Sequence, residues 1–167
     1  MARPRCPKCG DQLVMPTGPI SSPILLVGEF PGHEEIITGI PFVGKTGEIL
    51  QSELARLGLS MCDYRITNMW LHKPNKPKHE DCDVNWHLTQ MAKEINGRKL
   101  VLLMGSDLTK ALFNKSVTDI MGLKMECDRF PGIPMIISVN PAQAMHGPLG
   151  EFRLSLSRFQ KEIEHIH

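Results

Sequence analysis

The residues of this sequence best suited to binding a metal ion are its five cysteines, Cys6, Cys9, Cys62, Cys82 and Cys127. An odd number of cysteines is poor material for a disulfide framework, and a C-x-x-C pair in an intracellular protein more often binds metal or does redox work. Cys6 and Cys9 form such a pair within Cys-Pro-Lys-Cys-Gly, a sequence typical of zinc knuckles. We therefore interpret Cys6 and Cys9 as metal ligands. Cys62 and Cys127 have no assigned partner, and we expect them to be buried or to have no particular role.

A second group of reactive side chains follows apolar runs of the sequence. Residues 28–32 (Gly-Glu-Phe-Pro-Gly), Asn68 and residues 140–146 (Asn-Pro-Ala-Gln-Ala-Met-His) each come at or just after the end of such a run. In a parallel sheet, ligands bind outside the carboxyl ends of the strands. We therefore expect these segments to converge on one rim of the sheet, where the chemistry takes place.

The elements that must position these residues are short strands alternating with helices. One helix places Ile49, Leu50 and Leu54 at helical spacing and stops at Gly58. This alternation predicts a mainly parallel sheet of four strands, covered by helices on both faces. The expected strands are residues 23–29, 64–71, 99–104 and 134–139, and the expected helices are residues 46–57, 81–95, 106–113 and 151–166.

Composition limits the class of protein. The 167 residues are 41% hydrophobic, which suits a single domain, expected over residues 1–167. The net charge is only +1, with 19 basic and 18 acidic side chains, so any contact with DNA must come from a local patch. No apolar run approaches the roughly 20 residues that span a bilayer, and the start lacks the apolar stretch of a secretory signal. We expect a soluble, cytoplasmic monomer that does not bind membranes.

One motif points to a different chemistry. Residues 39–46, Gly-Ile-Pro-Phe-Val-Gly-Lys-Thr, match the pattern G-x-x-x-x-G-K-[ST] of phosphate-binding loops, and a predicted helix follows. Such a loop wraps backbone N–H groups around phosphates and leaves directly from a buried strand. Here Pro41 has no N–H, its neighbours are bulky, and residues 34–38 make a poor central strand. We therefore expect no nucleotide cofactor.

Residues 28–35 read Gly-Glu-Phe-Pro-Gly-His-Glu-Glu, and residues 39–47 read Gly-Ile-Pro-Phe-Val-Gly-Lys-Thr-Gly. These segments resemble the first motif block of family 4 and the related family X of the uracil-DNA glycosylases, G-E-x-P-G-x-x-E-D and G-x-P-F-V-G-x-x-G. The resemblance continues through residues 64–68, 102–105 and 140–141, so it spans nearly the whole chain. It implies a three-layer α/β/α sandwich with a central, mainly parallel four-stranded sheet.

The resemblance also implies roles for residues on the rim. In the family a flipped uracil stacks on the aromatic ring of the P-F-V-G segment, here Phe42, and an asparagine after the second strand, here Asn68, reads its edge. Glu29 and Glu35 match acidic positions, and a carboxylate, above all that of Glu29, would stabilise positive charge on the sugar and activate water. Phe30 would form part of the pocket wall. Taken alone, these residues would also suit core packing, a strand-end cap and a solvated loop.

The same resemblance implies a metal centre. The family holds a [4Fe–4S] cluster with an N-terminal C-x-x-C pair, a third ligand after the second strand and a final cysteine beyond it. Cys6, Cys9, His72 and Cys82 fall on these positions, and family X also has histidine at the third. The resemblance favours the cluster, but three thiolates and an imidazole also suit tetrahedral zinc, so spacing leaves the metal open. Either metal would have a structural role, because it would hold the N-terminal arm of residues 1–22 against the sheet.

The sequence departs from the family in its last motif and in one loop. Asn140 stands where most relatives have a histidine that donates to the uracil, and a neutral amide stabilises the leaving anion less well. His146 is a candidate replacement, and Met145 a candidate wedge for the gap left by a flipped base. The basic loop with Lys73 and Lys76 would touch DNA phosphates.

These features predict a DNA glycosylase that flips uracil, or a related modified pyrimidine, out of DNA and hydrolyses its N-glycosidic bond. A non-catalytic DNA-binding or inhibitory derivative of the same fold is the alternative, because the usual leaving-group donor is missing. A phosphate-loop enzyme that binds nucleotides ranks third.

Overall fold

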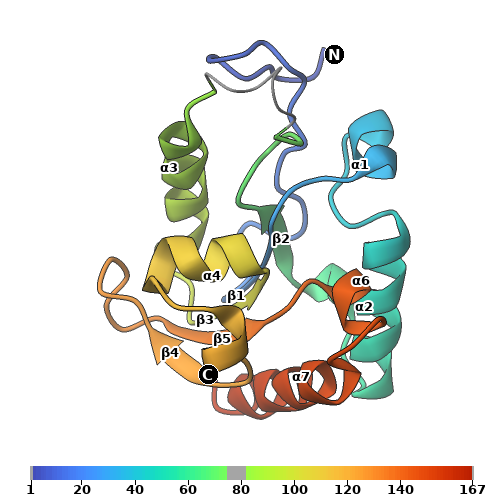
Figure 1. Ribbon diagram of the computed structural model, residues 1–167, viewed down its shortest axis with the longest axis vertical. Coiled ribbons are helices and arrows are strands. Elements are labelled where there is room, and N and C mark those ends of the chain that lie inside the picture. The colour runs from blue at the N-terminus through green and yellow to red at the C-terminus, as the bar shows by residue number, and fades with distance from the viewer. Residues whose placement is uncertain (1, 75–81, 167) are drawn as a thin grey trace.

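A computed structural model of the chain, which describes residues 2–74 and 82–166, is built around a five-stranded sheet (Figure 1). The strand order is β2-β1-β3-β5-β4, and all pairs are parallel except β4 with β5. The strands are β1 (Ile24–Gly28), β2 (Arg65–Asn68), β3 (Leu100–Met104), β4 (Lys124–Glu126) and β5 (Pro134–Ser138).

Helices cover both faces of the sheet. The chain runs from β1 to β2 in one direction along the sheet, and from β2 past β1 to β3 and on to β5 in the other, so the connections before and after β2 fall on opposite faces. Helices α2 and α7 pack together on one face, and α4 packs against β3 on the other (Figure 1). In the described residues no helix is long and apolar enough to cross a membrane. The helices are α1 (His33–Thr38), α2 (Lys45–Arg56), the 3-10 helix η1 (Met61–Asp63), α3 (Val84–Ile95), α4 (Ser106–Phe113), α5 (Val117–Ile120), α6 (Pro141–Ala144) and α7 (Leu149–Ile163).

The parallel register sets where the strands end. Every residue of β1 and β3 is buried, as expected for central strands with helices on both sides. Gly28 pairs with Asn68, and Met104 pairs with Ser138. The carboxyl ends of β1, β2, β3 and β5 therefore form one rim, and the loops that follow them meet there, as predicted.

The structure corrects three details of the predicted fold. The sheet has a fifth strand, β4, which is only three residues long and alternates exposed and half-buried positions, so it offers no apolar run to detect. Residues 33–38 form helix α1. The strand predicted over residues 64–71 already ends at Asn68, because Met69 and Trp70 leave the ladder and donate to the carbonyls of Gly28 and Glu29.

The N-terminal arm runs beside β2. Thr17 forms a bridge with Ile66, and the N–H of Val14 donates to the carbonyl of Leu71 at 2.7 Å. A small second core contains Cys6, Leu13 and Leu71. Backbone pairing and this core therefore hold the arm to the sheet in addition to any metal.

Candidate functional site

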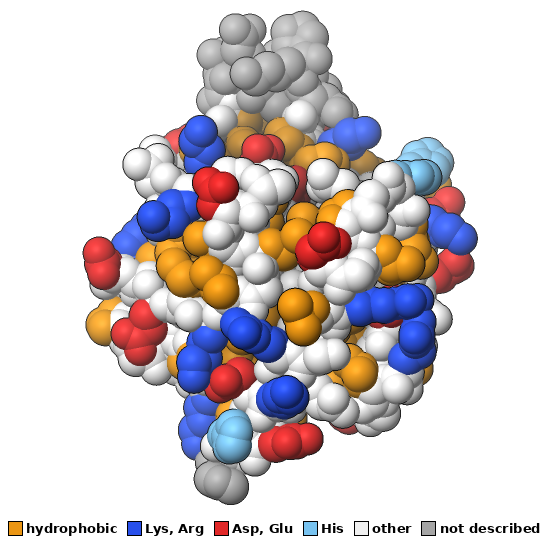
Figure 2. Space-filling model, turned by 60° about the horizontal axis from the view of Figure 1, so that its bottom comes forward, with side chains coloured by type: hydrophobic (Ala, Val, Ile, Leu, Met, Phe, Trp, Pro, Cys, Tyr) orange, Lys and Arg blue, Asp and Glu red, His pale blue; other side chains and the backbone are white. Residues whose placement is uncertain are grey.

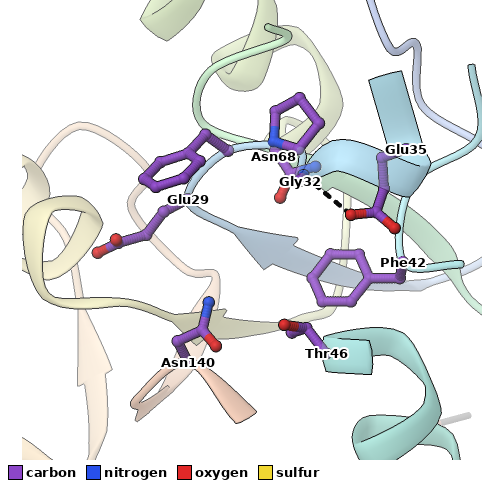
Figure 3. A pocket seen from close by; sticks show the side chains of 9 residues that line it. Glu29, Gly32, Glu35, Phe42, Thr46, Asn68 and Asn140 are labelled. Atoms are coloured by element: carbon purple, nitrogen blue, oxygen red, sulfur yellow. Dashed lines mark hydrogen bonds between the residues drawn. The ribbon is translucent and has the colours of Figure 1, made fainter. Parts of the chain in front are cut away.

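A cavity of about 120 Å³ opens at the rim where β1, β2 and β5 end (Figure 3). The loop after β1, the start of α2, the end of β2 and the start of α6 all contribute to it. The structure brings together here the predicted residues of four separate segments. The lining residues are Glu29, Phe30, Pro31, Gly32, Glu35, Phe42, Thr46, Asn68 and Asn140.

The ring of Phe42 forms one wall and is held there by unusual backbone geometry. Phe42 has φ +57°, a left-handed conformation that costs a non-glycine residue roughly 1–3 kcal/mol, and such strain concentrates at functional sites. A methyl group at Gly28 would lie 2.6 Å from Phe42 Cζ and 2.5 Å from Asn68 Oδ1. The glycine at the end of β1 therefore lets the ring and the amide approach the same point.

Glu35 holds the loop that carries Phe42. Its side chain is buried, and its carboxylate accepts hydrogen bonds from the N–H groups of Gly32 (2.9 Å), Val43 (3.2 Å) and Gly44 (2.6 Å). A carboxylate with three backbone donors is an effective internal brace. These contacts make Glu35 a positioning residue, and its predicted part in catalysis stays a prediction.

Glu29 lines the cavity, but its carboxylate is directed away from Phe42 (Figure 3). The N–H of Asp107, in the first turn of α4, donates to Glu29 Oε1 at 2.6 Å. Burial raises the pKa of the Glu29 carboxyl above its usual value, although the hydrogen bond from Asp107 opposes this shift. A methyl group at Gly105 would lie 2.1 Å from Glu29 Cγ, so a glycine is needed beside this side chain.

Two side-chain amides line the cavity, one at the end of β2 and one in the turn after β5. Asn68 is buried at the end of β2. Asn140 caps α6, and its Oδ1 accepts from the N–H of Ala142 at 2.9 Å. Because the cap requires an acceptor, the NH₂ group of Asn140 points into the cavity (Figure 3). The site thus offers an aromatic face and two amides that can recognise the edge of a planar ring.

The predicted metal ligands also meet, in a separate place at the N-terminal arm. His72 Nε2 lies 3.4 Å from both Cys9 Sγ and Cys82 Sγ, and Cys6 Sγ lies 3.8 Å from Cys82 Sγ. His87, on α3, also faces these sulfurs and was not predicted. Its only signal in the sequence is its place five residues after Cys82. This donor set fits a bound metal.

The electrostatics of the cysteines bear on metal binding, because only a thiolate binds a metal. Burial, reinforced by the thiols of Cys6 and Cys9, raises the pKa of Cys82 to about 12. Burial likewise disfavours the charged form of Cys6, yet N–H groups of Cys9 and Lys8 hydrogen-bond to its sulfur and hold its pKa below the ordinary value. Three neighbouring thiolates need a cation among them, and metal binding would release their protons.

Comparison with known proteins identifies the family. A sequence model of the Uracil DNA glycosylase superfamily matches residues 15–164. The chain belongs to this superfamily. A Type-4 uracil-DNA glycosylase of Pyrobaculum aerophilum is 28% identical over 93% of this chain and 86% of that protein. A protein of the same name from Thermotoga maritima is 26% identical over 84% of this chain and 76% of that protein. Another from Saccharolobus solfataricus is 33% identical over 73% of this chain and 58% of that protein. The predicted family and α/β fold are confirmed.

In this glycosylase fold the segment that matches a phosphate-binding loop has another task. It follows helix α1 and not a buried strand. The N–H groups of Val43 and Gly44, which a phosphate would need, already donate to Glu35. The carboxylate of Glu35 therefore takes the hydrogen bonds that a bound phosphate would need from this loop.

Some predicted residues of this superfamily member lie outside the cavity. His146 and Met145 are exposed on the turn after α6, and neither lines the cavity. Lys73 is exposed next to the metal ligand His72, and Lys76 lies outside the described residues. Thr46 lines the cavity from the first turn of α2 and was not predicted, because the sequence shows it only as part of the apparent phosphate loop.

Proposed function

We propose that this chain is a uracil-DNA glycosylase, which hydrolyses the bond between uracil and deoxyribose in DNA. The observation that carries the proposal is the convergence of Phe42, Asn68 and Asn140 on one cavity at the strand ends. The relatives named Type-4 uracil-DNA glycosylases support the same activity.

Recognition of the base follows from these side chains. A base inside a duplex cannot reach such a cavity, so the nucleotide must be flipped out of the stack. Its ring would stack on Phe42, a contact worth roughly 1–3 kcal/mol per base. The amide of Asn68 can donate to a carbonyl and accept from the N–H of a uracil edge.

Asn140 would stabilise the leaving base. As the glycosidic bond breaks, negative charge grows on the uracil oxygens, and a fixed donor aimed at that charge lowers the barrier. The cap on α6 holds the NH₂ group of Asn140 toward the cavity, so no reorganisation is needed. A neutral amide is a weaker donor to an anion than a charged group, which predicts slow cleavage.

Glu29 is the proposed catalytic carboxylate. Positive charge develops on the sugar during cleavage, and a carboxylate at the edge of the cavity stabilises it and orients the attacking water. Its hydrogen bond to α4 fixes its position. Glu35 acts through Phe42, by holding the loop in place.

Contacts with DNA must be local. Acidic and basic side chains are interspersed on the face shown in Figure 2, in keeping with the net charge of +1. Met145 is 46% exposed directly after α6, beside the cavity residue Asn140, and is the proposed wedge. Lys73 and Lys76 are proposed phosphate contacts, and His146 a further base contact. We also propose that the protein acts as a cytoplasmic monomer.

The proposed role of the metal centre is structural. Its residues are separate from those of the cavity, and the centre would tie the arm of residues 1–22 to α3 and to the loop after β2. The resemblance to families 4 and X implies a [4Fe–4S] cluster there, with zinc as the alternative.

The test is cleavage of end-labelled DNA containing one uracil, followed by alkali to break the strand at abasic sites. We expect cleavage at uracil and none in matched DNA containing thymine. Phe42→Ala should abolish cleavage, whereas Phe113→Ala, at the far end of α4, should retain it if the variant remains folded by circular dichroism. Tight binding of uracil-containing DNA with no abasic product would instead support the non-catalytic derivative, which the neutral Asn140 favours.

A further inference from the structure

The spacing of the donor atoms around the N-terminal arm is that of a single metal ion. We propose that Cys6, Cys9, Cys82 and His72 bind one tetrahedral zinc ion, and that His87 donates a hydrogen bond to the thiolates without binding the metal. The proposal concerns the metal alone and stands whether or not the chain cleaves uracil.

The distances between donors match a tetrahedron. With Zn–S of about 2.3 Å and Zn–N of about 2.0–2.1 Å, tetrahedral geometry places two sulfurs about 3.8 Å apart and a sulfur about 3.6 Å from a nitrogen. Cys6 Sγ and Cys82 Sγ are 3.8 Å apart, and His72 Nε2 is 3.4 Å from the sulfurs of Cys9 and Cys82. The ligand atoms of Cys6, His72 and Cys82 also lie within 4.8 Å of one another, and Cys9 joins this set through its contact with His72.

A [4Fe–4S] cluster does not fit the same arrangement. Each of its four irons takes a separate protein ligand, so the donors must be spread around a cuboid of iron and sulfide. Donors that approach one another to 3.4–3.8 Å leave no room for that cuboid between them. A cluster would require the arm and the loop after β2 to move apart.

The hydrogen bond of His72 gives it the tautomer of a ligand. Its Nδ1 lies 3.1 Å from the carbonyl oxygen of Lys73, which can only accept, so Nδ1 carries the proton. The Nε2 lone pair is then directed at the sulfurs of Cys9 and Cys82. Histidines that bind metals usually donate their other ring N–H in this way.

His87 has the opposite tautomer. The backbone N–H of Leu71 donates to His87 Nδ1 at 3.1 Å, so in the neutral ring the proton is on Nε2. That N–H lies 3.8 Å from Cys82 Sγ and 3.9 Å from Cys6 Sγ, within reach of a hydrogen bond to sulfur. A nitrogen that carries a proton cannot bind a metal, so His87 is a donor to the ligands.

A hydrogen bond from His87 to the thiolates is consistent with the net charge of the metal site. Three thiolates and one divalent cation leave a net negative charge, which is costly in a buried place unless donors surround it. His87 is fully buried between the indoles of Trp70 and Trp86, with ring centroids 4.8 and 5.0 Å away. Its N–H therefore supplies a donor where indole rings limit the access of water.

The first experiment measures metals in protein purified without oxygen from cells supplied with both iron and zinc. We expect one zinc per chain, little iron and no absorbance band near 400 nm. About four irons with acid-labile sulfide and a brown colour would overturn the single-ion proposal. Replacing zinc with Co²⁺ should give the visible bands of a tetrahedral ion with three thiolates.

Variants then separate ligands from the donor. His72→Ala should lose zinc, and Cys62→Ala, a cysteine exposed on η1, should keep it. His87→Gln should keep one zinc per chain and an unchanged Co²⁺ coordination number. Its loss to a chelator should be faster, with affinity reduced about 10–100-fold, as is usual for residues that support metal ligands.

His87→Ala serves as a second variant, in case glutamine still donates to the sulfurs. Loss of zinc from both His87 variants, or a Co²⁺ spectrum that reports one ligand fewer, would identify His87 as a ligand and overturn its proposed role. Both variants must first show wild-type circular dichroism, because His87 is buried.

Discussion

Glu35 Oε2 accepts a hydrogen bond from the N–H of Gly44 at 2.6 Å, and this contact fixes the loop that presents Phe42 to the cavity. The two residues are nine positions apart, and the strained Phe42 lies between them. The internal carboxylate thus stands where an apparent phosphate-binding loop would hold its ligand.

Removing this brace should impair the enzyme without unfolding it. Glu35→Gln places an NH₂ group among backbone N–H donors, so the loop should shift. A misplacement of about 1 Å can cost about 100-fold in rate, and we expect a loss of that order in single-turnover cleavage of uracil. Glu34→Gln, an exposed neighbour, is the control. Equal rates in both variants would show that the brace does not position the base.

The two functions of Asn140 can be separated by substitution. Asn140→Asp keeps the acceptor that caps α6 but removes the NH₂ donors, whereas Asn140→Ala removes both. We expect both to lose about 100–1,000-fold in cleavage rate, as for other donors to a developing anion. Only the alanine variant should lose stability, by about 1 kcal/mol in urea denaturation. An active aspartate variant would contradict the proposed donor.

The pKa of Glu29 predicts a dependence of activity on pH. Burial raises this pKa, so the carboxyl takes up its proton at a higher pH than an exposed glutamate does. If the carboxylate is the active form, cleavage should slow as the pH falls through the raised value. Glu29→Gln should be slow at every pH, with no such step. The measurement is a single-turnover rate profile from mildly acidic to neutral pH, and an unchanged step in the variant would assign the titration to another group.

The pair of Glu53 and Arg153 predicts a dependence of stability on pH. Arg153 on α7 binds both carboxylate oxygens of the buried Glu53 on α2, at 2.9 and 3.1 Å, and its hydrogen bonds hold the pKa of Glu53 below the usual value. Because the folded-state pKa is lowered, the stabilisation is present above the unfolded value of about 4.3 and is lost as pH falls through the folded value.

Arg153→Met should therefore destabilise the protein at neutral pH, since it leaves the carboxylate of Glu53 without its main partner. The difference from wild type should shrink as the pH falls from the unfolded value of about 4.3 through the lowered folded-state pKa, because Glu53 takes up its proton in that range. Arg56→Met is the matched control, because Arg56 is more exposed and lies 3.7 Å from the same carboxylate, a contact worth less than about 1 kcal/mol. Urea denaturation across pH checks both, and a difference that does not change with pH would contradict the assignment.

Much of the architecture of this protein follows from its amino-acid sequence alone. Apolar runs such as those of β1 and β3 favour buried central strands, and their alternation with helices favours a parallel sheet. A parallel sheet brings the carboxyl ends of its strands to one rim, so residues 28–32, Asn68 and Asn140 could be expected to meet there, whereas the place of Phe42 was implied by the resemblance. The resemblance of the motifs then indicated the family and the approximate ligand set.

Only the tertiary structure decided what each polar side chain does. Glu29 and Glu35 look alike in the sequence, yet one is held by α4 and the other by the loop of Phe42. His72 and His87 both face the same sulfurs, and they differ because one ring nitrogen meets a carbonyl and the other meets an N–H. The physical reason is that spacing along a chain sets which segments meet, whereas hydrogen-bond direction depends on partners from distant segments that appear only in the folded protein.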